Sequence, residues 1–488
     1  MKWSIQQILN WTGGKLISEG QSTVTGFDEF STDTRKPCQD KIFIALKGDE
    51  YDAHEFLDQA VAQGASAIFI HRLDPRFESL KSKVVIIQVP DTLRGLQDWA
   101  HHYRKTLKAK FFAVTGSNGK TTTKEFLASL LSAEYKTYFT EGSFNNHWGL
   151  PFSLLNVTAE HQCVVLEMGM NHAGEIARLV EIADPDYVAC TMVGTAHIEH
   201  FGSQKAIAKA KEEIYQTSRE ATIRIFNQDQ ELTFDMMYPI AKKYPASRML
   251  SFSGINDQAD VYFKLQPKDS EADEDTNPVA SMMQNIGLKI IGKIGGVDGT
   301  AKVPIFGEHN IINLMTAATM VLAAGMRPEK IWQALSRCGS AWGRNEFIST
   351  VEGIEILFDG YNANPDSMKA LFKNVQRIQP KGKKIAALGQ MKELGTFASQ
   401  FHKELAQAAV AVGFEKIFFY GENFKDFDEG LKIARCSSGV VAPEFSEALK
   451  MQIKETTQPG DLLVIKGSRG AKTENYVKIF NPINWKSK

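Results

Sequence analysis

Features of a secreted, membrane-embedded or nucleic-acid-binding protein are scarce in this sequence of 488 residues. Its 56 basic and 57 acidic residues leave a formal net charge of -1, which gives no reason to expect a nucleic-acid partner. Its five cysteines are scattered and form no CxxC pair, so the sequence encodes neither a disulfide framework nor a zinc site. A reducing cytoplasm fits this cysteine pattern.

Long hydrophobic runs are missing too. The opening residues MKWSIQQILNWTGG lack the basic start and unbroken apolar run of a signal peptide, and no stretch reaches the roughly 18 apolar residues of a membrane span. The nearest approach, residues 311–326, contains Asn313 and two threonines, and we predict a buried helix there. We therefore expect a cytoplasmic protein without a membrane span, and we expect a monomer.

The length of the chain is about three times that of a typical domain of roughly 150 residues. Short apolar strands alternate with amphipathic helical stretches, which predicts three α/β domains with mostly parallel strands. We place them at residues 1–107, 108–343 and 344–488, the last with a Rossmann-like alternation. A polar, acidic segment without periodicity, residues 268–278, is interpreted as a solvated excursion of the second domain.

The strands that support this division are short apolar runs followed by helical patterns. They are KIFIAL (41–46), ASAIFI (65–70) and KVVIIQV (83–89) in the first domain, FFAV (111–114), CVVLEMG (163–169) and YVACTMVG (187–194) in the second, and IEILF (354–358), KIAAL (384–388), KIFFY (416–420) and DLLVI (461–465) in the third. In the first domain we expect helices around residues 54–63 and from Thr92 onward.

A glycine-rich loop, TGSNGKTTT at 115–123, lies between an apolar strand and a helical run. Its glycines let backbone N–H groups approach an anion, Lys120 supplies a positive charge, and Thr121 offers a hydroxyl group to Mg2+. The spacing departs from the standard GxxxxGK[ST] pattern, and an ordinary glycine turn is the alternative. The strand–loop–helix context favours nucleotide binding.

Two candidate metal ligands lie where apolar strands end. Glu167 directly follows CVVL, and His197 lies just past the strand that begins at Tyr187. The carboxyl ends of parallel strands meet at one edge of the sheet, where the two residues could hold Mg2+ beside nucleotide phosphates. Taken singly, each is equally well explained as a structural polar group. Their shared edge with the glycine-rich loop favours the metal site.

Lys211 shares one face of a predicted helix with Ile207, Ala210 and Ile214. A lysine turned toward an apolar interior loses its proton readily, and the neutral amine can react with CO2 to give a carbamate, an anionic ligand for a second Mg2+. Periodicity alone favours a lysine whose ammonium group reaches the surface. Both interpretations stay open on this pattern.

Nine segments, taken together and in this order, resemble the Mur ligase family, most closely its dipeptide-adding members. They are TGSNGKTTTKE (115–125), FNNHWGLP (144–151), EMGMNHAGEI (167–176), GTAHIEHFGS (194–203), IAKAKEEI (207–214), GEHNIINLMTAA (307–318), FDGYNANPDSM (358–368), LGQMKELG (388–395) and KGSRG (466–470). The resemblance covers all three predicted domains.

The resemblance implies an ATP-dependent amide ligase of peptidoglycan synthesis. It would join UDP-N-acetylmuramoyl-tripeptide to D-alanyl-D-alanine through an acyl-phosphate, with ATP and two Mg2+ ions. The implied architecture is a small N-terminal nucleotide-sugar-binding domain, a central P-loop ATPase domain and a C-terminal Rossmann-like domain. Another Mur ligase or a folylpolyglutamate-synthase-like ligase is the nearest alternative, and a non-ligase ATP-binding switch is a remote one.

The resemblance also implies roles for individual residues. ATP would contact Thr115, Gly116, Ser117, Asn118, Gly119, Lys120, Thr121 and Thr122, with Asn313 facing the adenine, Arg344 the phosphates and Asp359 the ribose. The metal ligands would be Thr121 and Glu167 for one Mg2+, and His197 and a carbamylated Lys211 for the other. The implied catalytic set is Lys120, Glu167, His197, Lys211 and Arg344, and the implied substrate-binding set is Ser31, Thr34, Arg35, Asn145 and Asn146.

Arg35 would lie beside the diphosphate of the nucleotide sugar, and a surface arginine is the alternative. The sequence departs from the family pattern outside the implied metal and phosphate ligands. The departures are Thr34, Ala53, Met192, Glu212, Phe358 and Gln390.

Overall fold

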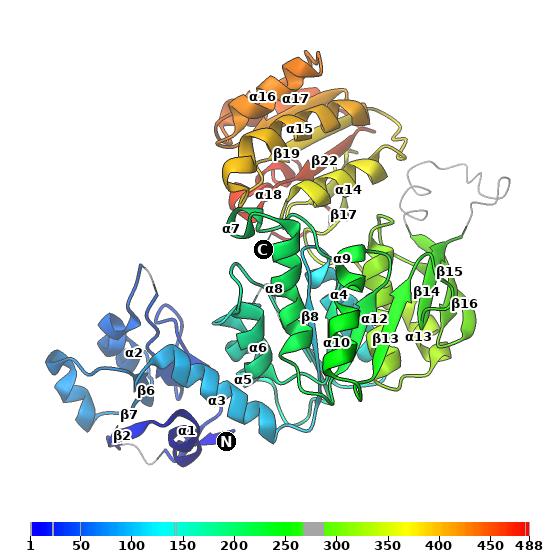
Figure 1. Ribbon diagram of the computed structural model, residues 1–488. Coiled ribbons are helices and arrows are strands. Elements are labelled where there is room, and N and C mark those ends of the chain that lie inside the picture. Colours follow the sequence, from blue (N-terminus) through cyan, green and yellow to red (C-terminus); the bar gives the residue numbers. More distant parts are fainter. Residues whose placement is uncertain are drawn as a thin grey trace.

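The computed structural model describes residues 2–21, 24–48, 50–140, 142, 144–266, 287–483 and 485–487. The chain folds into three α/β units, each built on its own sheet (Figure 1). Within these ranges, no helix combines the length and apolar character that crossing a membrane requires. The acidic segment 268–278 lies outside the described residues.

The N-terminal unit has a five-stranded sheet in the order β2-β7-β6-β5-β4, in which only the β2–β7 pair is antiparallel. Its strands are β2 (Lys15–Ser18), β4 (Phe30–Ser31), β5 (Ile42–Ile44), β6 (Ala67–Ile70) and β7 (Val85–Gln88). Its helices are α1 (Ile5–Thr12), α2 (Leu57–Ala62) and α3 (Thr92–Thr106), and a short hairpin pairs β1 (Trp3–Ser4) with β3 (Gly26–Phe27). The three strands and two helices predicted for this unit are confirmed.

The central unit has nine described strands in the order β16-β15-β14-β13-β12-β11-β8-β10-β9, parallel from β9 to β14. These are β8 (Lys110–Thr115), β9 (Thr137–Phe139), β10 (Cys163–Glu167), β11 (Tyr187–Cys190), β12 (Ile223–Asn227), β13 (Met249–Ser253), β14 (Val261–Leu265), β15 (Leu288–Ile294) and β16 (Val297–Val303). The described helices are α4 (Lys120–Leu131), α5 (Gly149–Asn156), α6 (Glu175–Ala183), α7 (Ile198–Phe201), α8 (Gln204–Gln216), α9 (Glu231–Phe234), α10 (Met237–Lys243), α12 (Asn310–Ala323) and α13 (Pro328–Ala334).

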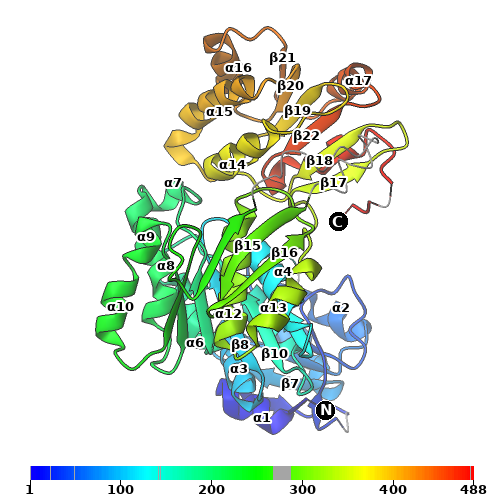
Figure 2. The same cartoon turned by 90° about the vertical axis from the view of Figure 1, so that its right-hand side faces the viewer.

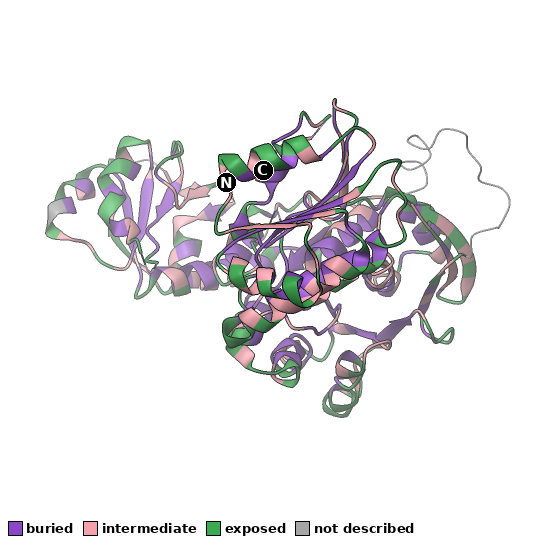
Figure 3. Ribbon diagram, turned by 90° about the horizontal axis from the view of Figure 1, so that it is seen from above, coloured by how far each residue is buried: buried purple, intermediate pink, exposed green. Residues whose placement is uncertain are grey.

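Helix α12 accounts for the longest apolar run of the sequence. Leu314, Ala317 and Val321 are fully buried in the core beside the central sheet, so the predicted buried helix is confirmed. Figure 3 shows the same pattern throughout the molecule, with buried strands inside and exposed helix faces outside. The sheets are covered because an apolar strand that faces helices on both sides loses its contact with water.

The C-terminal unit has a six-stranded sheet in the order β17-β18-β22-β19-β20-β21, in which only β17 is antiparallel. The strands are β17 (Glu346–Ser349), β18 (Glu355–Asp359), β19 (Lys384–Gly389), β20 (Lys416–Tyr420), β21 (Gly439–Ala442) and β22 (Leu462–Lys466). The helices are α14 (Pro365–Val375), α15 (Ala398–Val412), α16 (Phe424–Ile433), α17 (Glu447–Thr456) and α18 (Glu474–Val477). The four predicted strands are present, and the sequence analysis missed β17 and β21.

The three units meet around the central sheet. Helix α3 of the N-terminal unit lies against α5 and α6, and the C-terminal unit stands over α7 (Figures 1 and 2). The mixed α/β class with three sheets is therefore as predicted. The boundaries at 107/108 and 343/344 stay predictions.

Candidate active site

The glycine-rich loop connects β8 to the N-terminus of α4. Gly119 is the N-cap of α4 with φ of 83°, and an added Cβ there would collide with the amide oxygen of Asn313. No side chain caps this helix, so its first N–H groups face the loop, where an anion gains most from the helix dipole. Lys120 Nζ donates to Gly116 O at 2.8 Å across the same loop.

A cavity of about 240 Å³ opens beside this loop. It is lined by the phosphate loop, by the segments that follow β9 and β10, by the loop that carries His197 and by the start of the C-terminal unit. Of the predicted site residues, it is lined by Ser117, Asn118, Gly119, Lys120, Thr121, Asn145, Asn146, Glu167, His197 and Arg344.

Glu167 ends β10 and is 1% exposed at the wall of this cavity. Its Oε1 accepts a hydrogen bond from Asn145 Nδ2 at 2.7 Å, whereas Oε2 is buried without a partner among the described residues. A buried carboxylate oxygen without a donor is costly unless a cation or a proton meets it. Glu167 also opposes the lowering of the Lys120 pKa that burial causes.

His197 separates the first cavity from a second one of about 120 Å³, because it lines both. It has φ of 64°, and its Nδ1 lies 2.7 Å from Glu393 Oε2 of the C-terminal unit. The contact with His197 lowers the pKa of Glu393. The second cavity also holds two cationic side chains, Lys392 and Arg469.

Lys211 lies on α8, behind the cavity rather than in its lining. It is 1% exposed, so the surface-reaching alternative does not describe this lysine. Burial, with the nearby charge of Lys120, lowers the pKa of Lys211 to about 7. Burial therefore favours the neutral amine over the ammonium form of this side chain.

Arg344 lies in the segment that joins the central and C-terminal units. Its NH2 donates to Thr121 Oγ1 at 3.5 Å, and its guanidinium stands 4.4 Å from the centre of the Tyr361 ring. Nearby, Asp359 is buried in an ion pair with Lys466, whose Nζ lies 2.5 Å from Asp359 Oδ2. Asp359 is thus already paired and does not line either cavity.

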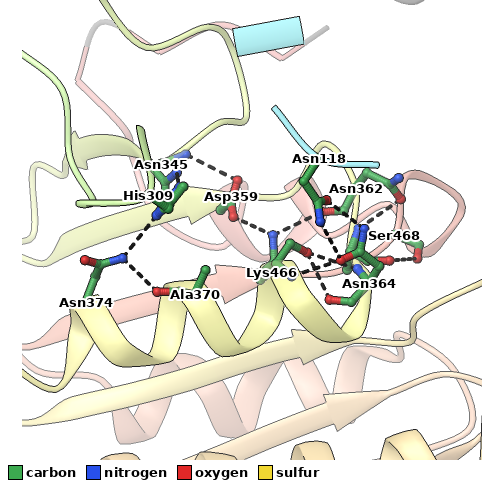
Figure 4. A network of polar contacts seen from close by, with 12 residues as sticks. Asn118, His309, Asn345, Asp359, Asn362, Asn364, Ala370, Asn374, Lys466 and Ser468 are labelled. Atoms are coloured by element: carbon green, nitrogen blue, oxygen red, sulfur yellow. Dashed lines mark hydrogen bonds and ion pairs between the residues drawn. The ribbon is translucent and has the colours of Figure 1, made fainter. Parts of the chain in front are cut away.

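A polar network around His309 ties the same segment to α14 (Figure 4). Asn345 Nδ2 lies 3.3 Å from His309 Nε2, and Asn374 Nδ2 lies 3.2 Å from His309 Nδ1. A neutral imidazole has only one acceptor nitrogen, and Asn345 Oδ1 has no partner among the described residues. Turning the Asn345 amide over would give its oxygen the Nε2 proton and would satisfy both groups.

The remaining predicted site residues lie outside the two cavities. Thr115, Gly116 and Thr122 belong to the strand end, loop and helix of the phosphate loop, and Asn313 packs under Gly119 with its Nδ2 donating to Asn310 Oδ1 at 2.9 Å. Ser31, Thr34 and Arg35 lie in the N-terminal unit.

Arg35 projects into solvent, with 85% of its side chain exposed, and pairs with Asp33 at 2.8 Å. That pairing lowers the pKa of Asp33 to about 2. Within the described structure the arginine is a surface residue, free to exchange this carboxylate for another anion.

The sequence of this chain is similar to those of known proteins. The family model of the Mur ligase middle domain matches residues 114–321, and that of the Mur ligase glutamate ligase domain matches residues 343–469. The chain is 34% identical over 98% of its length to a protein of Bacillus subtilis (strain 168) named UDP-N-acetylmuramoyl-tripeptide--D-alanyl-D-alanine ligase, of which 98% is covered. The chain belongs to the Mur ligase family.

Solved Mur ligases share the whole arrangement of units. A crystal structure of MurF from Acinetobacter baumannii superposes with a TM-score of 0.82 at 28% identity, covering 98% of both chains. MurF ligase from Thermotoga maritima, solved in complex with ADP, superposes with a TM-score of 0.76 at 25% identity, covering 92% of this chain and 96% of that one. The family therefore extends over all three units and includes a nucleotide-bound relative.

None of the six residues that depart from the Mur ligase pattern lines either of the two cavities. Met192 acts through its backbone, since its carbonyl accepts from Ser117 N at 2.8 Å. Phe358 is buried, with its ring 5.5 Å from that of Trp342. Gln390 accepts a backbone hydrogen bond from Glu422 at 2.7 Å.

The sequence analysis did not assign several residues of this Mur ligase that line or support the cavities. Asn362, Asn364 and Ser367 line the first cavity from the C-terminal unit, and Asp366 and Glu393 contact the loop that carries His197. These residues belong to segments FDGYNANPDSM and LGQMKELG, which carried the resemblance without a role for each side chain. Asparagine and carboxylate residues directly after apolar strands were the available signal.

Proposed function

We propose that this Mur ligase is the ATP-dependent enzyme that adds D-alanyl-D-alanine to UDP-N-acetylmuramoyl-tripeptide, giving the pentapeptide precursor of peptidoglycan. One observation carries the proposal. The cavity beside the phosphate loop, which is lined by the uncapped N-terminus of α4 and the buried carboxylate of Glu167, adjoins a second cavity lined by the cationic side chains of Lys392 and Arg469. The 34% identity to the Bacillus subtilis enzyme of that name supports the choice of substrates.

The reaction needs both cavities because a carboxylate and an amine do not condense at neutral pH. An oxygen of the tripeptide carboxylate attacks the γ-phosphorus of ATP, the bond to the β–γ bridging oxygen breaks, and ADP leaves behind an acyl-phosphate. The amine of the dipeptide then attacks the acyl carbon and loses one proton, and the C–O bond to phosphate breaks. Amide, ADP and inorganic phosphate are the products.

Within this chain, the first step depends on positioning and on positive charge. Lys120 and Arg344 face the first cavity and would offset the charge of the phosphates. Asn145 and Asn146 also line this cavity and would hold the reacting carboxylate and the γ-phosphate. The free carboxylate of D-alanyl-D-alanine would meet Lys392 and Arg469 in the second cavity.

The residues present fit Mg2+. Glu167 Oε2 is buried without a partner among the described residues, which is the donor atom that a hard cation takes. Thr121 and Glu167 would hold one ion, and His197 and a carbamylated Lys211 the other. When bound, Mg2+ neutralises phosphate charge in the transition state of phosphoryl transfer.

The carbamate on Lys211 is part of the proposal. The ammonium group first releases one proton. The lone pair of the neutral Nζ then attacks the carbon of CO2 and a second proton leaves the nitrogen, so a cationic side chain becomes an anionic one. The nearly complete burial of Lys211 supports the reactive neutral form. Without the carbamate, a protonated Lys211 would lie near the positive charge of Lys120.

The proposal extends to the N-terminal unit, to the cellular location of the enzyme and to its oligomeric state. Ser31, Thr34 and Arg35 would bind the uridine diphosphate group, for which Arg35 would leave Asp33. Because ATP and the nucleotide-linked precursor are both cytoplasmic metabolites, the enzyme would act in the cytoplasm, and it would act as a monomer. Size-exclusion chromatography with light scattering tests the monomer.

A turnover assay tests the activity. Phosphate release is measured with ATP, UDP-N-acetylmuramoyl-tripeptide and D-alanyl-D-alanine, and with each omitted in turn. We expect release only in the complete mixture, and a new amide product by mass spectrometry. Release with single amino acids in place of the dipeptide would indicate another Mur ligase, and release without either acceptor or amine would indicate an ATPase switch. Both results would overturn the proposal.

A further inference from the structure

The loop of residues 194–199, which carries His197, is held mainly from another unit of the molecule. It follows β11 of the central unit and leads into α7, which lies directly under the C-terminal unit (Figure 1). We call this segment the histidine loop. His197, within the loop, has φ of 64°, a conformation that a residue with a side chain adopts only where its surroundings hold it.

Asp366 supplies one of these holding contacts. It lies in the first turn of α14, and its Oδ2 accepts two hydrogen bonds from Thr195, one from the backbone N at 2.7 Å and one from Oγ1 at 2.8 Å. Gly194 leaves room for this approach, since an added Cβ would lie 2.5 Å from Asp366 Oδ2. The carboxylate therefore sits directly against the start of the histidine loop.

Two further contacts come from the segment after β19. Glu393 Oε2 lies 2.7 Å from His197 Nδ1, and Gly395 N donates to Glu199 Oε2 at 3.1 Å. Glu393 itself has φ of 61°, so both members of the histidine–carboxylate pair have a left-handed backbone. The C-terminal unit thus contacts the histidine loop at Thr195, at His197 and at Glu199.

These contacts fix where the imidazole can point. Nδ1 lies at ion-pair distance from Glu393, although the pair lacks hydrogen-bond alignment, and Nε2 is the ring nitrogen left for a ligand in the space between the two cavities. Carboxylate partners of this kind commonly set the ring orientation and tautomer of a functional histidine. Asp366 acts one step further away, because it lines neither cavity and does not contact the ring, but it holds Thr195, which lines the second cavity.

We propose that Asp366 is a positioning residue, which anchors Thr195 so that the histidine loop presents His197, oriented by Glu393, to the junction of the two cavities. The inference rests on the proposed ligase function for its effect on rate. The placement of the His197 ring does not depend on which amine is ligated, so the two can be tested separately. The central unit alone would then carry the phosphate loop without a correctly placed His197.

The test compares three variants of the full-length enzyme. Asp366→Ala removes both acceptor contacts, Asp366→Asn keeps an oxygen that can accept both, and Thr195→Val removes only the hydroxyl donor. Asp428→Ala is the matched control, because Asp428 is a carboxylate of the same unit whose described ion pair is with Lys432 on α16. Thermal unfolding of each variant verifies that it folds.

Kinetics provide the first measurement. We expect Asp366→Ala to lower kcat by about 10- to 100-fold while the affinity for ATP analogue, which the phosphate loop determines, stays within about twofold. Asp366→Asn should retain most of the activity, and the kcat of Thr195→Val should lie between those of the two Asp366 variants. When Thr195→Val is combined with Asp366→Ala, the double variant should lose no more kcat than Asp366→Ala alone. Full activity of Asp366→Ala, or equal loss in both Asp366 variants, would refute the inference.

The second measurement does not need turnover. Histidine labelled with 13C at Cε1 gives one resonance for each of the 11 histidines, and His197→Gln identifies that of His197. We expect Asp366→Ala to shift or broaden the His197 resonance, and Asp428→Ala to leave it in place. An unchanged resonance in Asp366→Ala would exclude the positioning role. If the resonance shifts but the wild-type enzyme ligates no dipeptide, the proposed function fails and the positioning role stands.

Discussion

Lys211 illustrates at the scale of one residue how burial changes the chemistry of a side chain. Its ammonium group would be stable in water, but at 1% exposure the charged form loses its hydration. The same desolvation acts on Lys120 and Lys466, whose pKa values are also lowered. Lys466 differs because a carboxylate lies against it.

Replacement of Lys211 by alanine tests the proposed carbamate. We expect Lys211→Ala to lower kcat by at least about 100-fold, because an anionic oxygen ligand is lost, and a short carboxylic acid to restore part of the activity by entering the space left. Lys209→Ala on the same helix is the control, since the Lys209 side chain is 77% exposed. Full activity of Lys211→Ala without added acid would disprove the carbamate role.

The ion pair of Lys466 and Asp359 leads to a stability prediction. Replacing Lys466 by methionine leaves the Asp359 carboxylate buried and unpaired, which costs about 3–5 kcal/mol. Adding Asp359→Asn should recover much of this loss because no uncompensated charge remains. Hydrogen exchange of the β22 amides measures the effect. Lys432→Met, which breaks an exposed ion pair, should change stability by less than about 1 kcal/mol. An equal effect of Lys466→Met and Lys432→Met would contradict the prediction.

At the scale of single elements, the N-terminus of α4 depends on a residue without a side chain. Gly119 and Gly174 are both helix N-caps in the left-handed region, with φ of 83° and 87°. Only Gly119 has a neighbour in the way, because an added Cβ there would meet Asn313, whereas nothing lies within 4 Å of the position at Gly174.

The pair Gly119→Ala and Gly174→Ala therefore separates backbone strain from collision. Both should lose about 1–2 kcal/mol of stability, the cost of a left-handed residue with a side chain. Gly119→Ala should also weaken ATP binding by at least about tenfold, because Asn313 and the phosphate loop must move apart. Calorimetric titration with a non-hydrolysable ATP analogue measures this. Equal affinity of the two variants would mean that the packing of Asn313 under the loop does not matter.

The junction of α12, the linker and α14 is expected to respond to pH through His309. Burial lowers the pKa of His309 to about 4, with Asp359 opposing and Lys466 reinforcing the effect. The unfolded chain binds this proton near pH 6.5 and the folded chain only near pH 4, so the stabilising contribution is present above about pH 6.5 and is lost as the pH falls toward 4.

His309→Gln cannot titrate and keeps a polar side chain, which makes it the matched variant. Between pH 7 and pH 5, the free energy of unfolding of the wild type should fall by about 1–2 kcal/mol more than that of His309→Gln. Urea unfolding followed by circular dichroism at each pH measures the difference. If the difference in free energy of unfolding between the wild type and His309→Gln did not change with pH, the pKa of His309 would not be lowered by folding.

At the scale of the whole molecule, the three units are joined in different ways. Helix α3 is fixed to the central unit, since Tyr103 OH donates to Val157 O at 2.7 Å and Arg104 Nε to Ala183 O at 3.0 Å. The C-terminal unit is connected through a segment in which Gly343 and Asn345 have φ of 66° and 49°. Residues with such angles are suited to absorb a hinge rotation.

We therefore predict that the C-terminal unit moves and the N-terminal unit does not. In small-angle scattering, ATP analogue together with the nucleotide-sugar substrate should decrease the radius of gyration, because closure assembles the two cavities and excludes water from the acyl-phosphate. Crosslinking α3 to α6 should leave this change intact. A particle size unaffected by ligands would disprove the closure.

The sequence and the tertiary structure account for different parts of this enzyme. Strands such as β8, β10 and β22, and the buried helix α12, could be predicted because burial repeats with the period of the local backbone. The location of Glu167 beside the phosphate loop could also be predicted, because parallel strands end at one edge of their sheet. The short strand β21 was missed, since its residues are only partly buried and its apolar signal is weak.

By itself, the sequence determined the order of the elements, the phosphate loop and the family, because each is written in neighbouring residues. Only the tertiary structure decided that Asp366 and Glu393 hold the histidine loop, that Lys466 pairs with Asp359, and that Lys211 is shielded from water. Such contacts join side chains from different units or layers, so they depend on how sheets and helices dock, which no local pattern of polar and apolar residues specifies.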